Sequence, residues 1–541
     1  MLLNYNRTIP DVFAEACKEY ADSPVFSCMN RTLSFRELDQ LSAKFAAYLQ
    51  QHTNLKPGDR VAVQLPNILQ YPVAVFGIMR AGMVVVNTNP LYTAHEIKHQ
   101  LNDSGAKALV ILANIAKNAS TIITETSVEQ VIVTELADLH APVQRLFINS
   151  IVKYVKKLVP DFSFPNQIGF CAALKKSALP WQPTPVTPDD IAVLQYTGGT
   201  TGVSKGAMLT HRNLVANMLQ LNHHMRSVFR INQELYVAPL PLYHIYSFTL
   251  HCTSAVSIGN HSLLIPNPRD IPGFVAALKN KPFSFFIGLN TLFNALLHNK
   301  EFRKLDFSHM RLTASGGMAL TLETAKRWIE LTGCGISEGY GLTETSPVVC
   351  TNPPDAIQLG TVGTLMVDTE CKVIDENGNS LPIGEAGELC IRGPQVMKGY
   401  WQRPDATAEV IDVEGWFKSG DMAVIGADGY LKIVDRKKDM INVSGFKVYP
   451  NEVEDVLSSH PDIIEAAVIG IPDADGSETV KAFVVSSNPE LTVQQVRAFA
   501  KTKLTAYKVP HLVDFCKDLP KTNVGKILRR ELRDKEIAKN K

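Results

Sequence analysis

The stretch YTGGTTGVSKGAMLTHRN, from Tyr196 to Asn213, surrounds the single Lys205 with glycines and hydroxyl side chains. Glycines let the backbone approach an anion closely, hydroxyl and amide groups donate hydrogen bonds to its oxygens, and the lysine supplies positive charge. The stretch therefore predicts a loop that holds phosphate groups. The structural alternative is a surface loop in which Gly and Thr serve only as turn residues.

The residues on either side of this loop separate it from a Walker loop. A Walker lysine is followed by Ser or Thr and leads directly into a helix, whereas Lys205 is followed by Gly206 and an apolar run. Only at Thr210 does an N-cap precede a helical pattern. Residues 191–196 have the pattern of a buried strand. We therefore expect a loop between two strands, and a P-loop NTPase is disfavoured.

Composition limits the class of protein. The 541 residues are enough for several compact units, and 54 Lys and Arg balance 53 Asp and Glu, so nucleic acid is not the expected partner. The nine cysteines are dispersed without metal-ligand spacing, as in a protein with reduced thiols. Asn4 and Arg7 come before any apolar core of a signal peptide could form. We expect a cytoplasmic protein.

One segment has the residue pattern of a helix that contacts a membrane surface. No stretch resembles the roughly 20 apolar residues that a spanning helix needs. In FINSIVKYVKKLVPDF, residues 147–162, apolar residues fall on one helical face beside three lysines. Two interpretations are open: peripheral contact with the inner face of the cytoplasmic membrane, or an ordinary amphipathic helix packed on the core. The sequence also leaves the oligomeric state open, a homodimer included.

The pattern of elements predicts an α/β fold with several subdomains. Residues 34–51 have a helical pattern, residues 60–65 a strand pattern, and such patterns alternate as in a layered α/β domain. Short strands between turns over 360–400 indicate a β-rich subdomain. A separate α+β unit follows, in which Thr492 and Gln495 are spaced as a capping box. We place the boundary at the charged run VDRKKD, Val434 to Asp439.

Four further motifs contain more polar and charged residues than a stable fold requires, although each motif alone could have a structural role. They are SEGYGLTETSP (337–347), WFKSGD (416–421), VDRKKD (434–439) and PKTNVGKILRREL (520–532). In this order they resemble the adenylate-forming superfamily of acyl-CoA synthetases, aryl-CoA ligases, luciferases and peptide-synthetase adenylation domains. Within it, residues 414–454 resemble the signature of the fatty acyl-CoA synthetases. The resemblance covers essentially the whole chain.

The resemblance implies ATP, Mg²⁺, coenzyme A and a fatty acid as cofactors and substrates. A carboxylate attacks the α-phosphate of ATP to give an acyl adenylate and pyrophosphate, and the thiol of CoA then displaces AMP. Both reactants of the first step are anionic, so cations and hydrogen-bond donors must be in place beforehand. The implied architecture is an N-terminal domain (1–435), a hinge (436–438) and a mobile C-terminal domain (439–541).

The resemblance also implies roles for individual residues. Glu344 would bind Mg²⁺, Thr343 would contact the α-phosphate, and Lys526 would bridge the carboxylate and that phosphate. The β- and γ-phosphates would be held by Thr197, Gly198, Gly199, Thr200, Thr201, Gly202, Ser204 and Lys205. The nucleoside would be bound by Tyr340 with Gly341 beside it, by the turn of Gly316 and Gly317, and by Asp421 and Arg436 at the ribose.

The remaining roles concern CoA, the hinge and the acyl chain. The resemblance places the hinge at Lys438, the pantetheine tunnel at Ser444 and Gly445, and an aromatic gate of the acyl tunnel at Phe248. His244, four residues before Phe248, is a candidate catalytic residue, and the alternative is a satisfied core histidine. An aryl-CoA ligase, a carrier-protein-loading acyl-AMP ligase and a catalytically silent lipid- or nucleotide-binding protein remain alternative functions.

Overall fold

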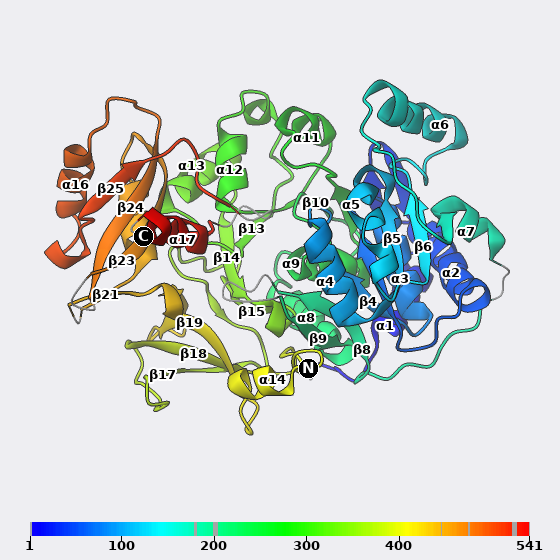
Figure 1. The fold of residues 1–541 in the computed structure, drawn as a ribbon, viewed down its shortest axis with the longest axis horizontal. Helices are drawn as coiled ribbons and strands as arrows, with labels where there is room; N and C mark the ends of the chain where they lie inside the picture. The colour runs from blue at the N-terminus through cyan, green and yellow to red at the C-terminus, as the bar shows by residue number, and fades with distance from the viewer. Residues whose placement is uncertain are drawn as a thin grey trace.

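Two mostly parallel β-sheets form the centre of the N-terminal part of the chain in the computed structural model (Figure 1). The structure describes residues 3–177, 181–197, 204–444, 446–473, 477–521 and 527–539. In these residues the first sheet has seven strands, parallel except for the last pair. In spatial order they are β7 (Gln167–Gly169), β6 (Gln130–Thr134), β5 (Ala106–Leu112), β3 (Arg60–Gln64), β4 (Val84–Asn87), β8 (Ile191–Tyr196) and β9 (Gly206–Thr210).

The second sheet has nine strands in the same described parts of the chain. Its central strands are parallel, and antiparallel neighbours flank them at both edges. In spatial order they are β16 (Thr364–Leu365), β15 (Val348–Thr351), β14 (Ile336–Gly341), β13 (Leu312–Gly316), β12 (Phe285–Gly288), β10 (Leu235–Ala238), β11 (His261–Leu264), β1 (Pro24–Cys28) and β2 (Arg31–Ser34).

Helices cover both faces of each sheet because the strands are apolar on both faces. In β3, Val61 and Val63 belong to the core between the sheets, whereas Ala62 belongs to a cluster on the outer face. The core between the sheets includes α1 (Ile9–Glu19), α2 (Phe35–His52), α3 (Gln70–Arg80), α7 (Phe170–Lys176), α8 (His211–His224), α9 (Ile245–Phe248) and α10 (Ala255–Ser257). The outer clusters include α4 (Ala94–Ser104) and α5 (Ala116–Ser120) on the first sheet, and α11 (Ile271–Leu278), α12 (Asn290–Leu297) and α13 (Leu322–Thr332) on the second.

The rest of the chain forms smaller units. An antiparallel sheet contains β17 (Glu370–Ile374), β18 (Ala386–Arg392), β19 (Phe417–Ile425) and β20 (Leu431–Arg436), with α14 (Pro404–Val410) between β18 and β19 in the chain. The C-terminal unit contains the hairpin of β21 (Ile441–Val443) and β22 (Phe446–Val448), a sheet of β23 (Ile463–Pro472), β24 (Glu478–Ser486) and β25 (Leu512–Phe515), and the helices α15 (Pro450–Ser458), α16 (Val493–Lys501) and α17 (Arg529–Lys539).

The structure confirms the predicted α/β fold class with a large N-terminal and a small C-terminal part (Figure 1). The loop after Tyr196 joins two antiparallel strands, β8 and β9, as predicted. Thr210 caps α8, and its Oγ1 accepts the N–H of Asn213 at 3.1 Å. The predicted β-rich subdomain and the capping box of Thr492 and Gln495 are also present.

The predicted amphipathic segment is the exception. It forms α6 (Pro142–Ser150) and a π-helical turn, η3 (Ile151–Val155), and α6 lies at the upper right of Figure 1, apart from the sheets. Only Val152 of these two elements is buried. Of the apolar residues that gave the pattern, Phe147, Val155 and Leu158 are exposed, whereas Ile148, Ile151 and Val159 are half-buried. The interpretation as a helix packed on the core therefore holds for only part of the segment. None of the helices in the described residues is long and apolar enough to cross a bilayer.

Candidate active site

A cavity of about 1310 Å³ lies where both large sheets meet the β-rich sheet. Its wall includes residues at the carboxyl ends of β8, β13 and β14, which is where open α/β sheets bind their ligands. Lys521 and Leu528 of the C-terminal unit also line it. Since ligand cavities measure roughly 300–1,000 Å³, this one has room for a nucleotide and a second substrate.

The described ends of the predicted phosphate loop lie on the cavity wall. Thr197 donates its backbone N–H to the carbonyl of Lys205 at 3.0 Å, which closes the β8–β9 hairpin, and Thr197, Ser204 and Lys205 all line the cavity. The Nζ of Lys205 lies 5.1 Å from the centroid of the Tyr400 ring. The other loop residues predicted to bind phosphate lie outside the described residues: Gly198, Gly199, Thr200, Thr201 and Gly202.

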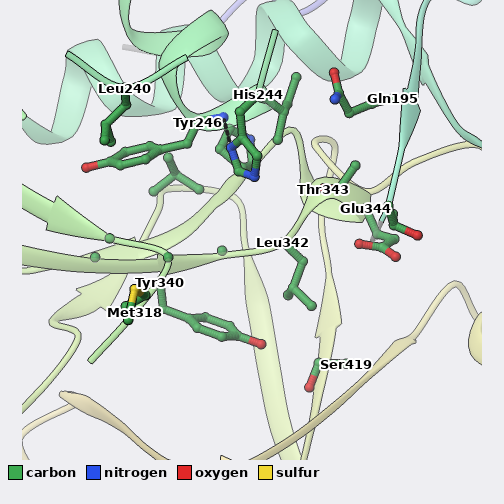
Figure 2. A pocket seen from close by; sticks show the side chains of 18 of the residues that line it. Gln195, Leu240, His244, Tyr246, Met318, Tyr340, Leu342, Thr343, Glu344 and Ser419 are labelled. Carbon is green, nitrogen blue, oxygen red and sulfur yellow. Dashed lines mark hydrogen bonds between the residues drawn. The ribbon is translucent and has the colours of Figure 1, made fainter. Parts of the chain in front are cut away.

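Glu344 lies on the one-turn 3₁₀ helix η6 (Thr343–Thr345) that follows β14, and its carboxylate lies close to Thr343 in Figure 2. The hydroxyl of Tyr400 donates to its Oε1 at 2.7 Å. Burial raises the pKa of the Glu344 carboxyl. Burial and the neighbouring carboxylate also raise the pKa of Tyr400, which keeps its hydroxyl protonated as the donor. Tyr400 thus contacts both the lysine of the loop and the predicted metal ligand.

Asp421 holds together three parts of the site. It lies opposite Arg436 in the β19–β20 pairing, and its Oδ1 is 3.1 Å from Nε of Arg436. Its Oδ2 accepts the hydroxyl of Tyr340, from β14, at 2.6 Å. The Asp421 side chain is only 5% exposed, so the two partners offset the cost of burying its charge. Burial and the nearby Asp421 charge raise the pKa of Tyr340.

Glycines make room around the predicted nucleoside site. Gly316, Gly317 and Gly341 all line the cavity, as does the ring of Tyr340. Gly317 has a φ of +83°, which favours glycine. A Cβ on Gly341 would lie 2.0 Å from the carbonyl oxygen of Pro347, so no larger residue fits there. The segment therefore depends on glycine for its path along the cavity.

The structure brings His244 to the cavity but not Phe248. His244 is the N-cap of α9, and its Nδ1 accepts the N–H of Tyr246 at 3.4 Å (Figure 2). Tyr246 and Leu250 line the cavity, whereas Phe248 is 1% exposed and packs in the core between the sheets. Phe248 is two positions from Tyr246 in the helical turn α9, so the two side chains point to nearly opposite sides. Phe248 is therefore not on the wall of this cavity, and its role as a gate of the acyl tunnel stays a prediction.

The structure describes only some of the predicted site residues in the C-terminal part. Lys526 and Gly445 lie outside the described residues, but Lys521 and Leu528 on either side of Lys526 line the cavity. Ser444 is exposed in the turn of the β21–β22 hairpin and is not on the wall. Lys438 lies in the short 3₁₀ helix η7 (Lys437–Asp439), where burial lowers the pKa of its ammonium group.

Sequence reasoning missed several residues of the wall. Asn87, at the end of β4, donates to Oε1 of Gln195 at 2.9 Å, and Gln195 donates to the carbonyl of Tyr243 at 3.0 Å. A polar residue in an otherwise apolar strand pattern is the sequence signal that could have identified Asn87 and Gln195. Tyr400 gave no such signal, because its contact with Glu344 spans 56 positions.

An apolar lobe extends the cavity beyond the polar centre. Its wall comes from α8 and the residues after it, from the π-helical turn η4 (Thr249–Ser254), and from β12 and the residue that follows it. These side chains belong to one buried cluster or pack against it. The members of the apolar lobe are Leu221, Met225, Phe229, Leu250, Phe285 and Leu289. One cavity therefore joins a polar centre to an apolar pocket.

Comparisons with known proteins identify the class that this fold and site define. The sequence profile of the AMP-binding enzymes matches residues 13–401, and that of the AMP-binding enzyme C-terminal domain matches residues 452–526. The chain belongs to the family of AMP-binding enzymes. The resemblance inferred from the motifs is thereby confirmed.

Particular relatives narrow this class. The chain is 51% identical over 535 residues to the long-chain-fatty-acid–CoA ligase of Escherichia coli O6:H1, with 98% of this chain and 95% of that protein covered. ATP-bound MatB of Rhodopseudomonas palustris has a TM-score of 0.81 and 28% identity, covering 98% and 99% of the two chains. The anthranilate CoA ligase AuaEII with anthranoyl-AMP shares the fold, with a TM-score of 0.88, 24% identity and 100% and 99% coverage.

The contacts of Asp421 predict an effect on nucleotide binding. We expect Asp421→Asn to raise KM for ATP about tenfold or more with a smaller change in kcat, since hydrogen bonds to charged groups contribute about 1.5–3 kcal/mol. Tyr340→Phe keeps the ring and serves as the matched control, with a smaller rise. Steady-state kinetics with ATP varied measures both. An unchanged KM in a folded Asp421→Asn enzyme would contradict the assignment.

Proposed function

We propose that the protein activates long-chain fatty acids with ATP and transfers the acyl group to coenzyme A through an acyl adenylate. The single observation that carries this proposal is the joined cavity, in which the apolar lobe opens onto the polar centre of Lys205, Glu344 and Tyr340. A fatty acid needs an apolar pocket for its chain and cations near its carboxylate. The relatives named as long-chain-fatty-acid–CoA ligases support the same substrate class.

The polar centre has the groups that the first half-reaction requires. Lys205 and the hydroxyls of Thr197 and Ser204 would bind the β- and γ-phosphates, Thr343 the α-phosphate, and Asp421 the ribose. Lys526, which lies in the sequence between the cavity-lining Lys521 and Leu528, would neutralise charge as the fatty-acid carboxylate attacks the α-phosphate and pyrophosphate leaves. His244 would position substrate at the entrance to the apolar lobe.

A magnesium ion fits the chemistry of Glu344. Mg²⁺ prefers carboxylate and phosphate oxygens, and in nucleotide sites it is held by one or two carboxylates together with the phosphates. Burial raises the pKa of Glu344, and a cation beside it would favour the ionised carboxylate. When bound with ATP, the ion would neutralise phosphate charge, while Tyr400 orients the carboxylate through its hydrogen bond.

The second half-reaction would use a different placement of the C-terminal domain, with residues 436–438 as the hinge and Lys438 at its centre. Rotation would bring the hairpin of Ser444 and Gly445 to the cavity, to line the path of the CoA thiol. In the present structure Ser444 is exposed, while Lys521 and Leu528 line the cavity. This placement suits the adenylation step.

An ion cluster around the buried Asp435 would hold this placement. The guanidinium of Arg529, in α17, lies 3.2 Å from Asp435 Oδ1, directly before the hinge, and 3.6 Å from Asp439 Oδ2, directly after it. It also pairs with Glu454 of α15 at 2.6 Å. The second oxygen of Asp435 accepts the N–H of Asn451 at 2.7 Å. Rotation about the hinge would break the contacts to Asp435.

The cluster predicts unequal effects on the two half-reactions. We expect Arg529→Gln to slow acyl-adenylate formation about tenfold or more, because losing one partner of a buried ion pair costs about 3–5 kcal/mol. Thioester formation from synthetic acyl adenylate and CoA should be slowed less. Rapid-quench assays measure the two steps separately.

The control is Lys535→Gln, which removes an exposed pair with Glu531 on the same helix and should leave both steps unchanged. Circular dichroism checks that each variant is folded. Equal slowing of both steps in folded Arg529→Gln enzyme would contradict the role of the cluster in domain placement.

The apolar lobe predicts the chain-length preference. We expect wild-type turnover to require CoA and to favour long-chain over short-chain and aromatic acids. Met225→Trp narrows the lobe and should lower kcat/KM for palmitate about tenfold or more, while octanoate changes little, since one methylene too many in a pocket costs about 1–3 kcal/mol. AMP release across a series of acids is the measurement.

Met225→Leu preserves the volume and is the matched control, with an unchanged profile. A folded Met225→Trp enzyme with the wild-type profile would place the acyl chain elsewhere. Turnover limited to aromatic acids, or an adenylate that CoA cannot discharge, would contradict the proposed function and support an aryl-CoA or carrier-loading ligase.

A further inference from the structure

We propose that α6 and η3 form a docking surface for an anionic lipid bilayer. The surface is distinct from the cavity, and it comes from one continuous segment of the chain. We define the α6–η3 surface, with the three residues that follow η3, by its exposed apolar residues Val143, Leu146, Phe147, Tyr154, Val155 and Leu158 and its exposed basic residues Lys153, Lys156 and Lys157.

The apolar residues of this surface face solvent. Their exposed fractions range from 54% for Leu158 to 82% for Val143, and Phe147 is 65% exposed. No residue of α6 is buried. Single exposed apolar residues are common on protein surfaces, but a contiguous group of this kind marks a site of interaction with a protein or a membrane.

The protein holds the segment from its inner side and leaves the outer side uncovered. Asn149 accepts the N–H of Ala137 at 2.9 Å, and Asn114 donates to the carbonyl of Leu158 at 3.2 Å. Val152 is buried beneath the segment. The π-helical turn continues α6, closed by the N–H of Lys156 on the carbonyl of Ile151 at 2.8 Å. The segment is thus an ordered part of the fold.

The charge of the segment identifies its partner. Residues 142–160 contain Arg145, Lys153, Lys156 and Lys157 and no Asp or Glu. Apolar side chains beside lysines suit a bilayer, where the apolar groups enter the acyl region and the ammonium groups contact anionic headgroups. In a symmetric dimer the same surface would face its own copy and place like charges together, which is unfavourable.

This surface is independent of the proposed substrate, because exposure and charge alone define it. If the substrate is a long-chain fatty acid, docking would bring the enzyme to the phase into which such acids partition. The vesicle experiment below contains no substrate, so its failure would leave the proposed function untouched.

Vesicle co-sedimentation of the full chain tests the proposal. The probes are vesicles of equimolar phosphatidylglycerol and phosphatidylcholine, and vesicles of phosphatidylcholine alone. We expect binding to the anionic vesicles at low ionic strength and much weaker binding to the neutral ones. Joint replacement of Lys153, Lys156 and Lys157 by Gln should weaken partitioning about 100-fold, the effect expected of three basic residues at an anionic surface.

A second variant, Phe147→Ser with Val155→Ser, should weaken binding about tenfold or more through lost apolar burial. The matched control is Ile383→Ser with Val413→Ser, which replaces two exposed apolar residues of the β-rich subdomain and should bind as the wild type does. A wild-type protein that does not bind anionic vesicles would overturn the proposal. So would a concentration-dependent dimer that only the Phe147 and Val155 variant abolishes, which would make the surface a contact between copies.

Discussion

The buried carboxylate of Asp421 is the interaction on which the arrangement of the site depends. One oxygen contacts Arg436 at the end of β20, and the other accepts the hydroxyl of Tyr340 from the nine-stranded sheet. Removing a carboxylate from water is costly unless it is paired, so both partners are held close to it. This constraint fixes the β-rich sheet against the large sheet, and it fixes the start of the predicted hinge relative to the nucleoside site.

A second set of contacts relates the phosphate loop to the predicted metal ligand. Tyr400 lies against Lys205 with its ring and donates to Glu344 with its hydroxyl. The side chains that would meet the phosphates are therefore positioned before the substrate arrives. Two anions can react only if charged and hydrogen-bonding groups already surround them. Since these side chains are in place, they need not reorganise in the transition state. The apolar lobe beside them adds the environment for an acyl chain.

Much of this fold could be predicted from the sequence because its signals are local. The strand–loop–strand unit after Tyr196, the N-cap at Thr210 and the β-rich subdomain each follow from neighbouring residues. The order of short motifs also pointed to residues that the structure places around one cavity, among them Lys205, Tyr340, Glu344 and Arg436.

Other features depend on contacts between distant residues. No local sequence pattern indicates the hydrogen bond from Tyr400 to Glu344 or the ion pair of Arg529 with Asp435. The position of Phe248 depends on the direction in which its helical turn faces. That orientation places Phe248 in the core and not on the cavity wall. For residues 147–162, periodicity indicated a helix but not its π-helical turn or its end at Val155, and it could not tell which apolar residues the rest of the protein would cover.

The proposed reaction forms an acyl adenylate before CoA takes part. Exchange of labelled pyrophosphate into ATP, measured without CoA, tests this most directly. We predict exchange that requires a long-chain fatty acid and falls by about two to three orders of magnitude in Lys526→Ala, the scale of one lost electrostatic contact in a preorganised site. Exchange that is independent of fatty acid, or release of ADP and phosphate in place of AMP and pyrophosphate, would contradict it.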